Sequence, residues 1–159
     1  MSRTSLERAI PDGDRVLLDT STLAAYLDGG EQVSVLAAVI VDSFVRTGRN
    51  QAIVSMVTVM ELLVRPLRIG ARAPYRHVLD FLTHFPNLLL VEIDLAIAQE
   101  AASQRAANRF SAPDALIVAT GLITQVGHLV TNDNQWGARL RPVSQRLKVC
   151  CLNDHLSLP

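Results

Sequence analysis

Short apolar runs alternate with longer helical patterns along the whole chain. Runs of four to six residues, bounded by polar or turn residues, predict strands; they span 15–18, 52–55, 88–93, 128–131 and 148–152. Segments with helical spacing and helix-start signals separate these runs; they span 20–27, 33–45, 58–64, 72–85, 94–109 and a further stretch from 112. Strands that alternate with helices pair in parallel, and helices then cover both faces of the sheet.

This alternation predicts an α/β fold, a single-domain three-layer sandwich with a central, mostly parallel sheet. We place the domain at residues 15–152, with a C-terminal tail at 153–159. Residues 1–14 carry charges throughout and show no apolar core segment, so we expect them to form a flexible N-terminal extension. A length of 159 residues with 49% hydrophobic content suits one core and is short for two.

Charge and cysteine content narrow the function classes. Fifteen basic and fifteen acidic residues leave no net charge, so any contact with nucleic acid must come from a local patch. Cys150 and Cys151 are adjacent, which excludes a disulfide framework or a zinc site built on them and favours a reducing cytoplasm. The apolar runs are too short to cross a bilayer, and we therefore expect a cytoplasmic protein without a membrane segment.

Four acidic residues share one predicted edge of the sheet. Asp19 and Asp133 follow strands, whereas Glu61 and Asp114 stand early in helices. Ligands of open parallel sheets bind outside the carboxyl ends of the strands, where these positions converge. Carboxylates held this close repel one another unless a cation lies between them. Ligands that are all oxygens indicate magnesium or manganese.

Each acid taken alone also has a structural explanation. Asp19 can cap a helix after a strand, and Glu61 with Thr58 matches the capping-box pattern Thr-x-x-Glu. Asp114 follows a serine and a proline, as in many first helical turns. Asp133 stands in TNDN, a composition typical of turns. Only the position of all four on one rim favours a metal site over these local roles.

Four segments carry a resemblance to a known family. They are LLDTSTL at 17–23, VTVMELL at 57–63, PDALIVATG at 113–121 and VTNDNQW at 130–136. In this order they resemble the sequence blocks of the PIN domain, and more specifically of VapC-type ribonuclease toxins of type II toxin-antitoxin systems. The resemblance covers about residues 15–152, and the set of blocks is more specific than any one of them.

The resemblance implies a ribonuclease that depends on Mg²⁺ or Mn²⁺ and hydrolyses RNA phosphodiester bonds, with transfer or ribosomal RNA as substrate. It also implies homodimerisation and inhibition by a cognate antitoxin. The family's acidic ligands fall on Asp19, Glu61, Asp114 and Asp133, and its supporting hydroxyls fall on Ser21 and Thr131. Some members carry another acid where this chain has Asn134, which leaves the ligation of a second metal open.

RNA binding would require cations near the acidic rim. The candidates are Arg65, Arg68, Arg72 and Arg76, which form the densest basic stretch, and Arg139 in a second stretch after the fourth acid. For any one of these arginines, an ordinary solvated surface position is an equally good interpretation.

Three other classes compete with the nuclease hypothesis. A receiver domain would carry paired acids after the first strand and a lysine late in the sheet, whereas DTST offers one acid and Lys148 opens the last strand. A haloacid-dehalogenase-type phosphatase would carry an acid where Ser21 stands. A catalytically silent PIN-like binding module remains the main alternative, although the complete acidic set argues against it.

Overall fold

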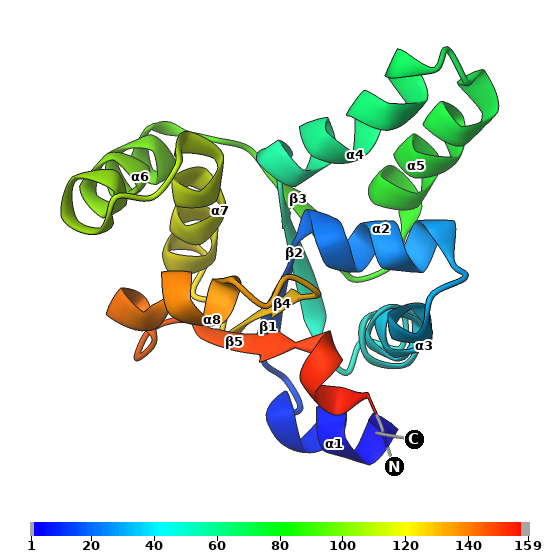
Figure 1. Ribbon diagram of the computed structural model, residues 1–159, viewed down its shortest axis with the longest axis horizontal. Helices are drawn as coiled ribbons and strands as arrows, with labels where there is room; N and C mark the ends of the chain where they lie inside the picture. Colours follow the sequence, from blue (N-terminus) through cyan, green and yellow to red (C-terminus); the bar gives the residue numbers. More distant parts are fainter. Residues whose placement is uncertain (1, 157–159) are drawn as a thin grey trace.

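A parallel sheet of five strands organises the protein, for which a computed structural model describes residues 2–156 (Figure 1). The strands lie in the order β3-β2-β1-β4-β5, and all neighbouring pairs run parallel. Their bounds are β1 Arg15–Leu18, β2 Gln51–Ser55, β3 Leu88–Val91, β4 His128–Thr131 and β5 Lys148–Cys151. The predicted α/β fold with a parallel sheet is therefore confirmed.

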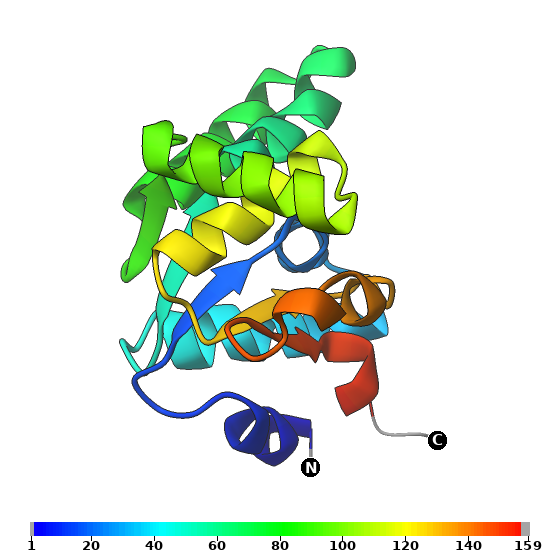
Figure 2. The same cartoon turned by 90° about the vertical axis from the view of Figure 1, so that its left-hand side faces the viewer.

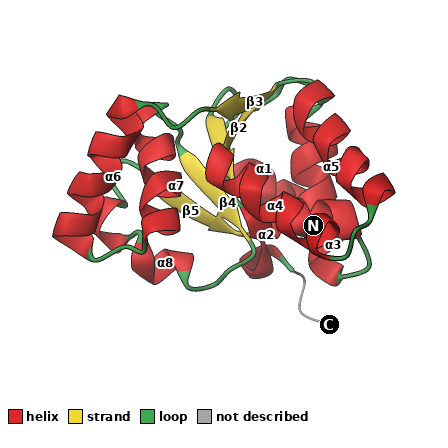
Figure 3. Cartoon of the chain, turned by 90° about the horizontal axis from the view of Figure 1, so that it is seen from above, coloured by secondary structure: helices red, strands yellow, loops and turns green. Residues whose placement is uncertain are grey.

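Helices form a layer on each side of this sheet (Figure 3). The α-helices are α1 Ser2–Ala9, α2 Thr20–Asp28, α3 Gln32–Ala38, α4 Met56–Arg68, α5 Arg72–His84, α6 Leu95–Asn108, α7 Ala112–Ile123 and α8 Trp136–Arg139. A π-helix, η1 Val39–Val45, continues α3, and two 3₁₀ turns, η2 Arg141–Val143 and η3 Leu152–His155, flank β5. Residues 157–159 of the expected tail lie outside the described residues.

The central strand β1 separates two hydrophobic cores. Val16 and Leu18 pack into the core shared with α2, α3 and η1, whereas Leu17 packs into the core shared with α6, α7 and α8. Successive side chains of a strand point to opposite faces, so one short apolar run serves both cores. This is why the strands have near-continuous apolar sequences rather than an alternation of apolar and polar residues.

The N-terminal segment contains a helix where the sequence pattern predicted a flexible extension. Residues 2–9 form α1, and Leu6 and Ile10 are fully buried in the same core as α3 and η1. Ser5 Oγ lies 2.7 Å from His155 Nδ1, which joins α1 to η3 at the foot of the sheet (Figure 2). Leu6 and Ile10 lie on one helical face because they are four residues apart. The charges around them masked that spacing in the sequence.

The carboxyl edge of the sheet leads directly into helices. Asp19, the residue after β1, is the N-cap of α2, and Ser55, the last residue of β2, is the N-cap of α4. The segment after β4 turns within four residues into α8. Helix N-termini and strand ends therefore gather at one rim, as the sequence predicted.

None of the helices within residues 2–156 is by itself both long and apolar enough to cross a membrane. The segments 20–28 and 32–45 reach the required length only as a pair, and they are bent by 103° relative to each other.

Candidate active site

Asp19 is the deepest acid of the rim. Its side chain accepts hydrogen bonds from Ser21 Oγ at 2.8 Å and Thr131 Oγ1 at 2.6 Å, and from the backbone N–H of Thr22 at 3.0 Å. The bond from Thr22 is a helix cap, so the local explanation of Asp19 holds. The two hydroxyl bonds exceed what a cap needs, and they fix both carboxylate oxygens.

Burial destabilises the ionised form of Asp19. The residue is only 4% exposed, and this desolvation raises the pKa of the Asp19 carboxyl, while the hydrogen bonds from Thr131, Thr22 and Ser21 lower it and only partly offset the effect. A buried carboxylate without a cation is costly to keep charged. A divalent cation beside it would remove that cost.

Glu61 is positioned by α2 rather than by its own helix end. Because Ser55 is the N-cap of α4, Thr58 and Glu61 lie beyond the N-cap position and cannot form the expected capping box. Thr58 Oγ1 is instead buried and has no hydrogen-bond partner within residues 2–156. Thr20 Oγ1, from the first turn of α2, donates to Glu61 Oε2. This bond holds Glu61 in the lining of the pocket that also contains Asp19.

Asp114 and Asp133 meet on the other side of the pocket. Asp114 lies in the first turn of α7, whose cap is Ser111, and its backbone N–H donates to Ser111 Oγ at 3.3 Å. Asp133 forms the turn that its sequence suggested, with Oδ1 accepting from the Gln135 N–H at 2.9 Å. Their remaining Oδ2 atoms share Arg139, whose Nη1 lies 3.7 Å from Asp114 and 3.3 Å from Asp133.

One pocket therefore contains all four predicted acids. It is lined by Asp19, Thr20, Ser21, Glu61, Asp114, Ile117, Asp133, Trp136 and Arg139. As the side chains stand, no three acidic, histidine or cysteine residues among 2–156 are grouped closely enough to hold a metal ion. The donor chemistry nevertheless fits Mg²⁺ or Mn²⁺, since the acidic and hydroxyl groups of the lining offer only oxygen.

The sequence pattern indicated the acids and the two hydroxyls but not two of the contacts between elements. Ser21 and Thr131 lie against Asp19 and 3.3 Å from each other. The bond from Thr20 to Glu61 joins residues 41 positions apart, and no local pattern indicates it. The pattern offers Arg139 as an RNA-binding candidate near the rim, and the structure places it in the lining of the acidic pocket, where its ion pairs were not indicated by the sequence.

The four arginines of the basic stretch lie outside the acidic pocket, along the end of α4 and the start of α5, and Arg65 lines the neighbouring pocket together with Glu61. All are exposed; they are Arg65, Arg68, Arg72 and Arg76. Arg65 Nη1 lies 3.2 Å from Asp28 Oδ2, and both side chains are largely exposed, so this pair contributes little to stability. The α4–α5 hairpin therefore carries a local basic patch on a chain with no net charge.

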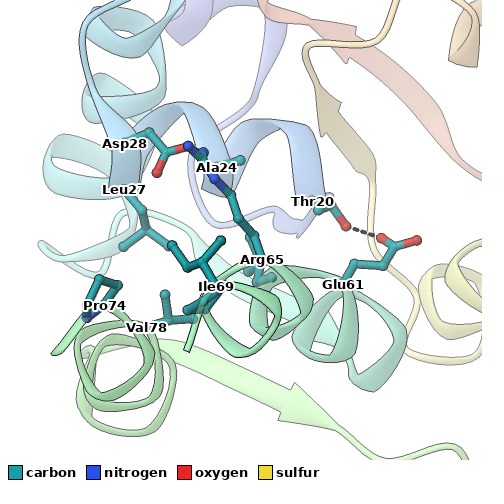
Figure 4. A pocket seen from close by; sticks show the side chains of 11 residues that line it. Thr20, Ala24, Leu27, Asp28, Glu61, Arg65, Ile69, Pro74 and Val78 are labelled. Carbon is teal, nitrogen blue, oxygen red and sulfur yellow. Dashed lines mark hydrogen bonds and ion pairs between the residues drawn. The ribbon is translucent and has the colours of Figure 1, made fainter. Parts of the chain in front are cut away.

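A second pocket lies between α2, α4 and α5, beside the acidic one (Figure 4). Thr20 and Glu61 line both pockets. The remaining lining is mostly apolar, and it consists of Ala24, Leu27, Leu62, Pro66, Ile69, Pro74 and Val78, with Asp28 and Arg65 as its charged members. We call this second pocket the apolar groove.

The sequence profile of the PIN domain matches residues 16–139. The chain belongs to the PIN domain family. The resemblance proposed from the four sequence segments is thus confirmed, and the receiver and phosphatase interpretations are set aside. No curated protein shows significant sequence similarity to the chain.

Solved structures with a similar fold include toxins and toxin-antitoxin complexes. A toxin-antitoxin complex from Klebsiella pneumoniae is 20% identical, with 86% of this chain and 97% of that chain covered and a TM-score of 0.62. For VapBC2 from Rickettsia felis, bound to a promoter DNA fragment, the values are 12%, 86%, 98% and 0.64. For VapC20 from Mycobacterium tuberculosis, a toxin that cleaves the sarcin-ricin loop, they are 15%, 77%, 93% and 0.63. At these identities the likeness shows the fold.

Replacing Asp19 by asparagine tests the cost of its buried charge. The native state holds the Asp19 proton to a higher pH than the unfolded chain does, because burial raises the pKa of Asp19. In EDTA, the parent should therefore lose stability as pH rises from about 4 through that raised pKa, by at most about 1.4 kcal/mol per pH unit from this group. Asp19→Asn should lack this slope.

Urea denaturation at several pH values between about 4 and 7 measures the difference. Asp12→Asn, at an exposed acid, serves as the control and should follow the parent. If Asp19→Asn is less stable than the parent in EDTA at neutral pH, the buried ionised carboxylate does not lower the free energy of unfolding.

Proposed function

We propose that this PIN domain is a Mg²⁺- or Mn²⁺-dependent ribonuclease that hydrolyses RNA phosphodiester bonds, and that it is the toxin of a toxin-antitoxin pair. The observation that carries the proposal is the convergence of four carboxylates in one pocket at the carboxyl edge of the sheet. The deepest of them is Asp19, whose burial makes its ionised form costly in free energy. A residue kept only for stability would not need this cost.

The residues of the pocket have two roles, which are to bind the cation and to orient the carboxylates. Asp19, Glu61, Asp114 and Asp133 would hold the cation, which when bound supplies an activated water and offsets the charge that develops on the phosphate. Ser21 and Thr131 keep both oxygens of Asp19 in one orientation through their hydroxyl donors. Thr20 performs the same task for Glu61.

An RNA substrate is supported by the relatives and by the basic patch. One similar structure is a toxin that cleaves the sarcin-ricin loop, which is ribosomal RNA, so we propose transfer or ribosomal RNA as the substrate class. The exposed arginines lie after Glu61 in the chain, on the second half of α4 and on α5. We propose that they hold the phosphate backbone of a strand that enters the acidic pocket. Such a toxin would act in the cytoplasm.

Cleavage should require a divalent cation. Purified protein incubated with total RNA should give discrete fragments with Mg²⁺ or Mn²⁺, no cleavage in EDTA, and no rescue by Zn²⁺, because the proposed ligands are all oxygens. Asp114→Asn should reduce the rate by more than about 100-fold, since even residues that only support a ligand are worth about 10- to 100-fold.

Asp94→Asn is the matched control for this assay. Asp94 also lies at the carboxyl edge of the sheet, where it caps α6 by accepting from the Ile97 N–H at 2.9 Å, but it does not line the pocket. Asparagine caps a helix as well as aspartate, so this variant should keep full activity. Undiminished cleavage in EDTA, or equal activity of the Asp114 and Asp94 variants, contradicts the metal mechanism and favours the silent binding module.

The basic patch should contribute to RNA affinity through phosphates. Single alanine substitutions at Arg68, Arg72 and Arg76 should weaken RNA binding and reduce the slope of log K against log salt by about one for each phosphate that the variant no longer neutralises. Fluorescence anisotropy with labelled RNA in EDTA, from low to moderate salt, measures this slope. Arg8→Ala on α1, an exposed arginine that lines neither pocket, should leave it unchanged. Unchanged slopes in all three variants would place the RNA elsewhere.

The apolar groove supports the antitoxin part of the proposal. Similar structures include complexes of toxins with antitoxins. The groove lies directly beside the acidic pocket and shares Thr20 and Glu61 with it, so an apolar segment bound there would cover one wall of the active site. Homodimerisation stays a prediction from the family resemblance.

A charged residue introduced into the groove should prevent neutralisation by the antitoxin and leave the toxicity of the protein unchanged. Ile69 lines the groove and is 67% exposed, whereas Val35 on α3 is 68% exposed and lies outside it. Ile69→Asp should still arrest growth when expressed alone, but co-expressed antitoxin should no longer restore growth, because an aspartate cannot be buried against an apolar segment. Val35→Asp should be rescued as the parent is. Equal rescue of both variants would exclude the groove as the antitoxin site.

A further inference from the structure

Arg139 lies inside the acidic pocket, where cations are expected to bind. Its Nη1 atom lies 3.3 Å from Asp133 Oδ2 and 3.7 Å from Asp114 Oδ2. Its Nη2 atom donates to Gln135 Oε1 at 2.6 Å, and its guanidinium carbon lies 5.5 Å from the centre of the Trp136 ring. The side chain is 34% exposed, so solvent screens these contacts less than those of a surface pair.

These contacts hold the guanidinium from two directions. Two carboxylates attract it from the pocket side, and Gln135 and Trp136 support it from α8 and the turn before it. An arginine does not lose its proton in proteins, so Arg139 can give up this position only by moving its side chain. The two carboxylates that it joins come from α7 and from the turn after β4, and both are proposed metal ligands.

We propose that Arg139 is an internal counter-cation that occupies the place of the metal between Asp114 and Asp133, and that it sets the metal affinity of the site. The inference rests on the proposed function, since it takes Asp114 and Asp133 to be ligands. A divalent cation and the guanidinium compete for the same two Oδ2 atoms. Metal binding therefore requires Arg139 to release both carboxylates, and the metal-free protein is stabilised by the same contacts.

The contacts of Arg139 explain how Asp114 and Asp133 can lie near each other without a bound metal ion. Like charges repel, and a pocket with no internal cation would drive Asp114 and Asp133 apart or protonate them. Arg139 offsets half of the charge of this pair, while Thr20 donates to the third acid, Glu61, and hydroxyl donors satisfy the fourth, Asp19.

Metal titration of Arg139→Gln tests the proposal without reference to cleavage. Glutamine keeps a polar side chain but removes the competing charge. The Kd for Mn²⁺ measured by calorimetry should therefore fall by about fivefold, which corresponds to the free energy of one ion pair. Trp136, the single tryptophan of the chain, lines the pocket and gives a second readout through its fluorescence. In EDTA the variant should melt about 2–4 °C below the parent, and added Mn²⁺ should close that gap.

Arg146→Gln is the charge-matched control. Arg146 lies 3.9 Å from Glu100, outside the acidic pocket, and its replacement changes the net charge by the same amount. Its Kd for Mn²⁺ should equal that of the parent, which separates local competition from the overall field. If Arg139→Gln does not fold in EDTA, Arg139→Lys takes its place, because a lysine keeps the charge but lacks the planar fork, and its Kd should also fall below that of the parent.

The outcomes distinguish this inference from the proposed function. A parent that binds Mn²⁺ and cleaves RNA, with a Kd that Arg139→Gln leaves equal or weaker, overturns the role of Arg139 alone. A parent and a variant that both fail to bind Mn²⁺ overturn the metal site and the competition together. A tighter Kd in the Arg139 variant with an unchanged Kd in the Arg146 variant supports the proposal.

Discussion

The hydrogen bond from Thr131 to Asp19 is the contact on which the site depends. It joins the ends of two neighbouring parallel strands, β1 and β4, and buries the carboxylate that it satisfies. A buried carboxylate needs such donors, and their positions follow from the parallel register that sets Leu18 beside Val130. An antiparallel pairing would send the two strand ends to opposite edges. The sheet topology therefore decides that Asp19 and Asp133 line one pocket and that the buried Thr131 contacts Asp19.

The same constraint explains why capping and metal binding are not exclusive interpretations of these acids. A helix that starts at the carboxyl edge has unpaired N–H groups, which attract an acceptor such as Asp19. A carboxylate has two oxygens with several lone pairs, and capping uses only part of this capacity. Asp19 caps α2 while both its oxygens face hydroxyl donors, and Asp133 forms a turn through Oδ1 while Oδ2 faces the pocket.

The sequence predicted the features that depend on local pattern. Apolar runs located the strands, and the acids at their ends followed from the geometry of parallel sheets. It did not indicate α1, because Leu6 and Ile10 are two apolar residues among charges and their burial depends on a partner, η3, near the other end of the chain. It offered Arg139 as an RNA-binding candidate near the rim but did not indicate the ion pair with Asp114, because the two residues lie 25 positions apart.

Two pockets with a common wall would give the proposed toxin a physical route from antitoxin binding to inhibition. Thr20 and Glu61 line both the acidic pocket and the apolar groove, and they are joined by a hydrogen bond. A segment seated in the groove thus contacts a proposed ligand and the hydroxyl that orients it. Such a segment need not reach Asp19 to change the chemistry, because moving Thr20 alone would release Glu61 from its fixed orientation. Under the proposed function, the position of the groove beside Glu61 would be enough for an antitoxin segment bound there to inhibit the site.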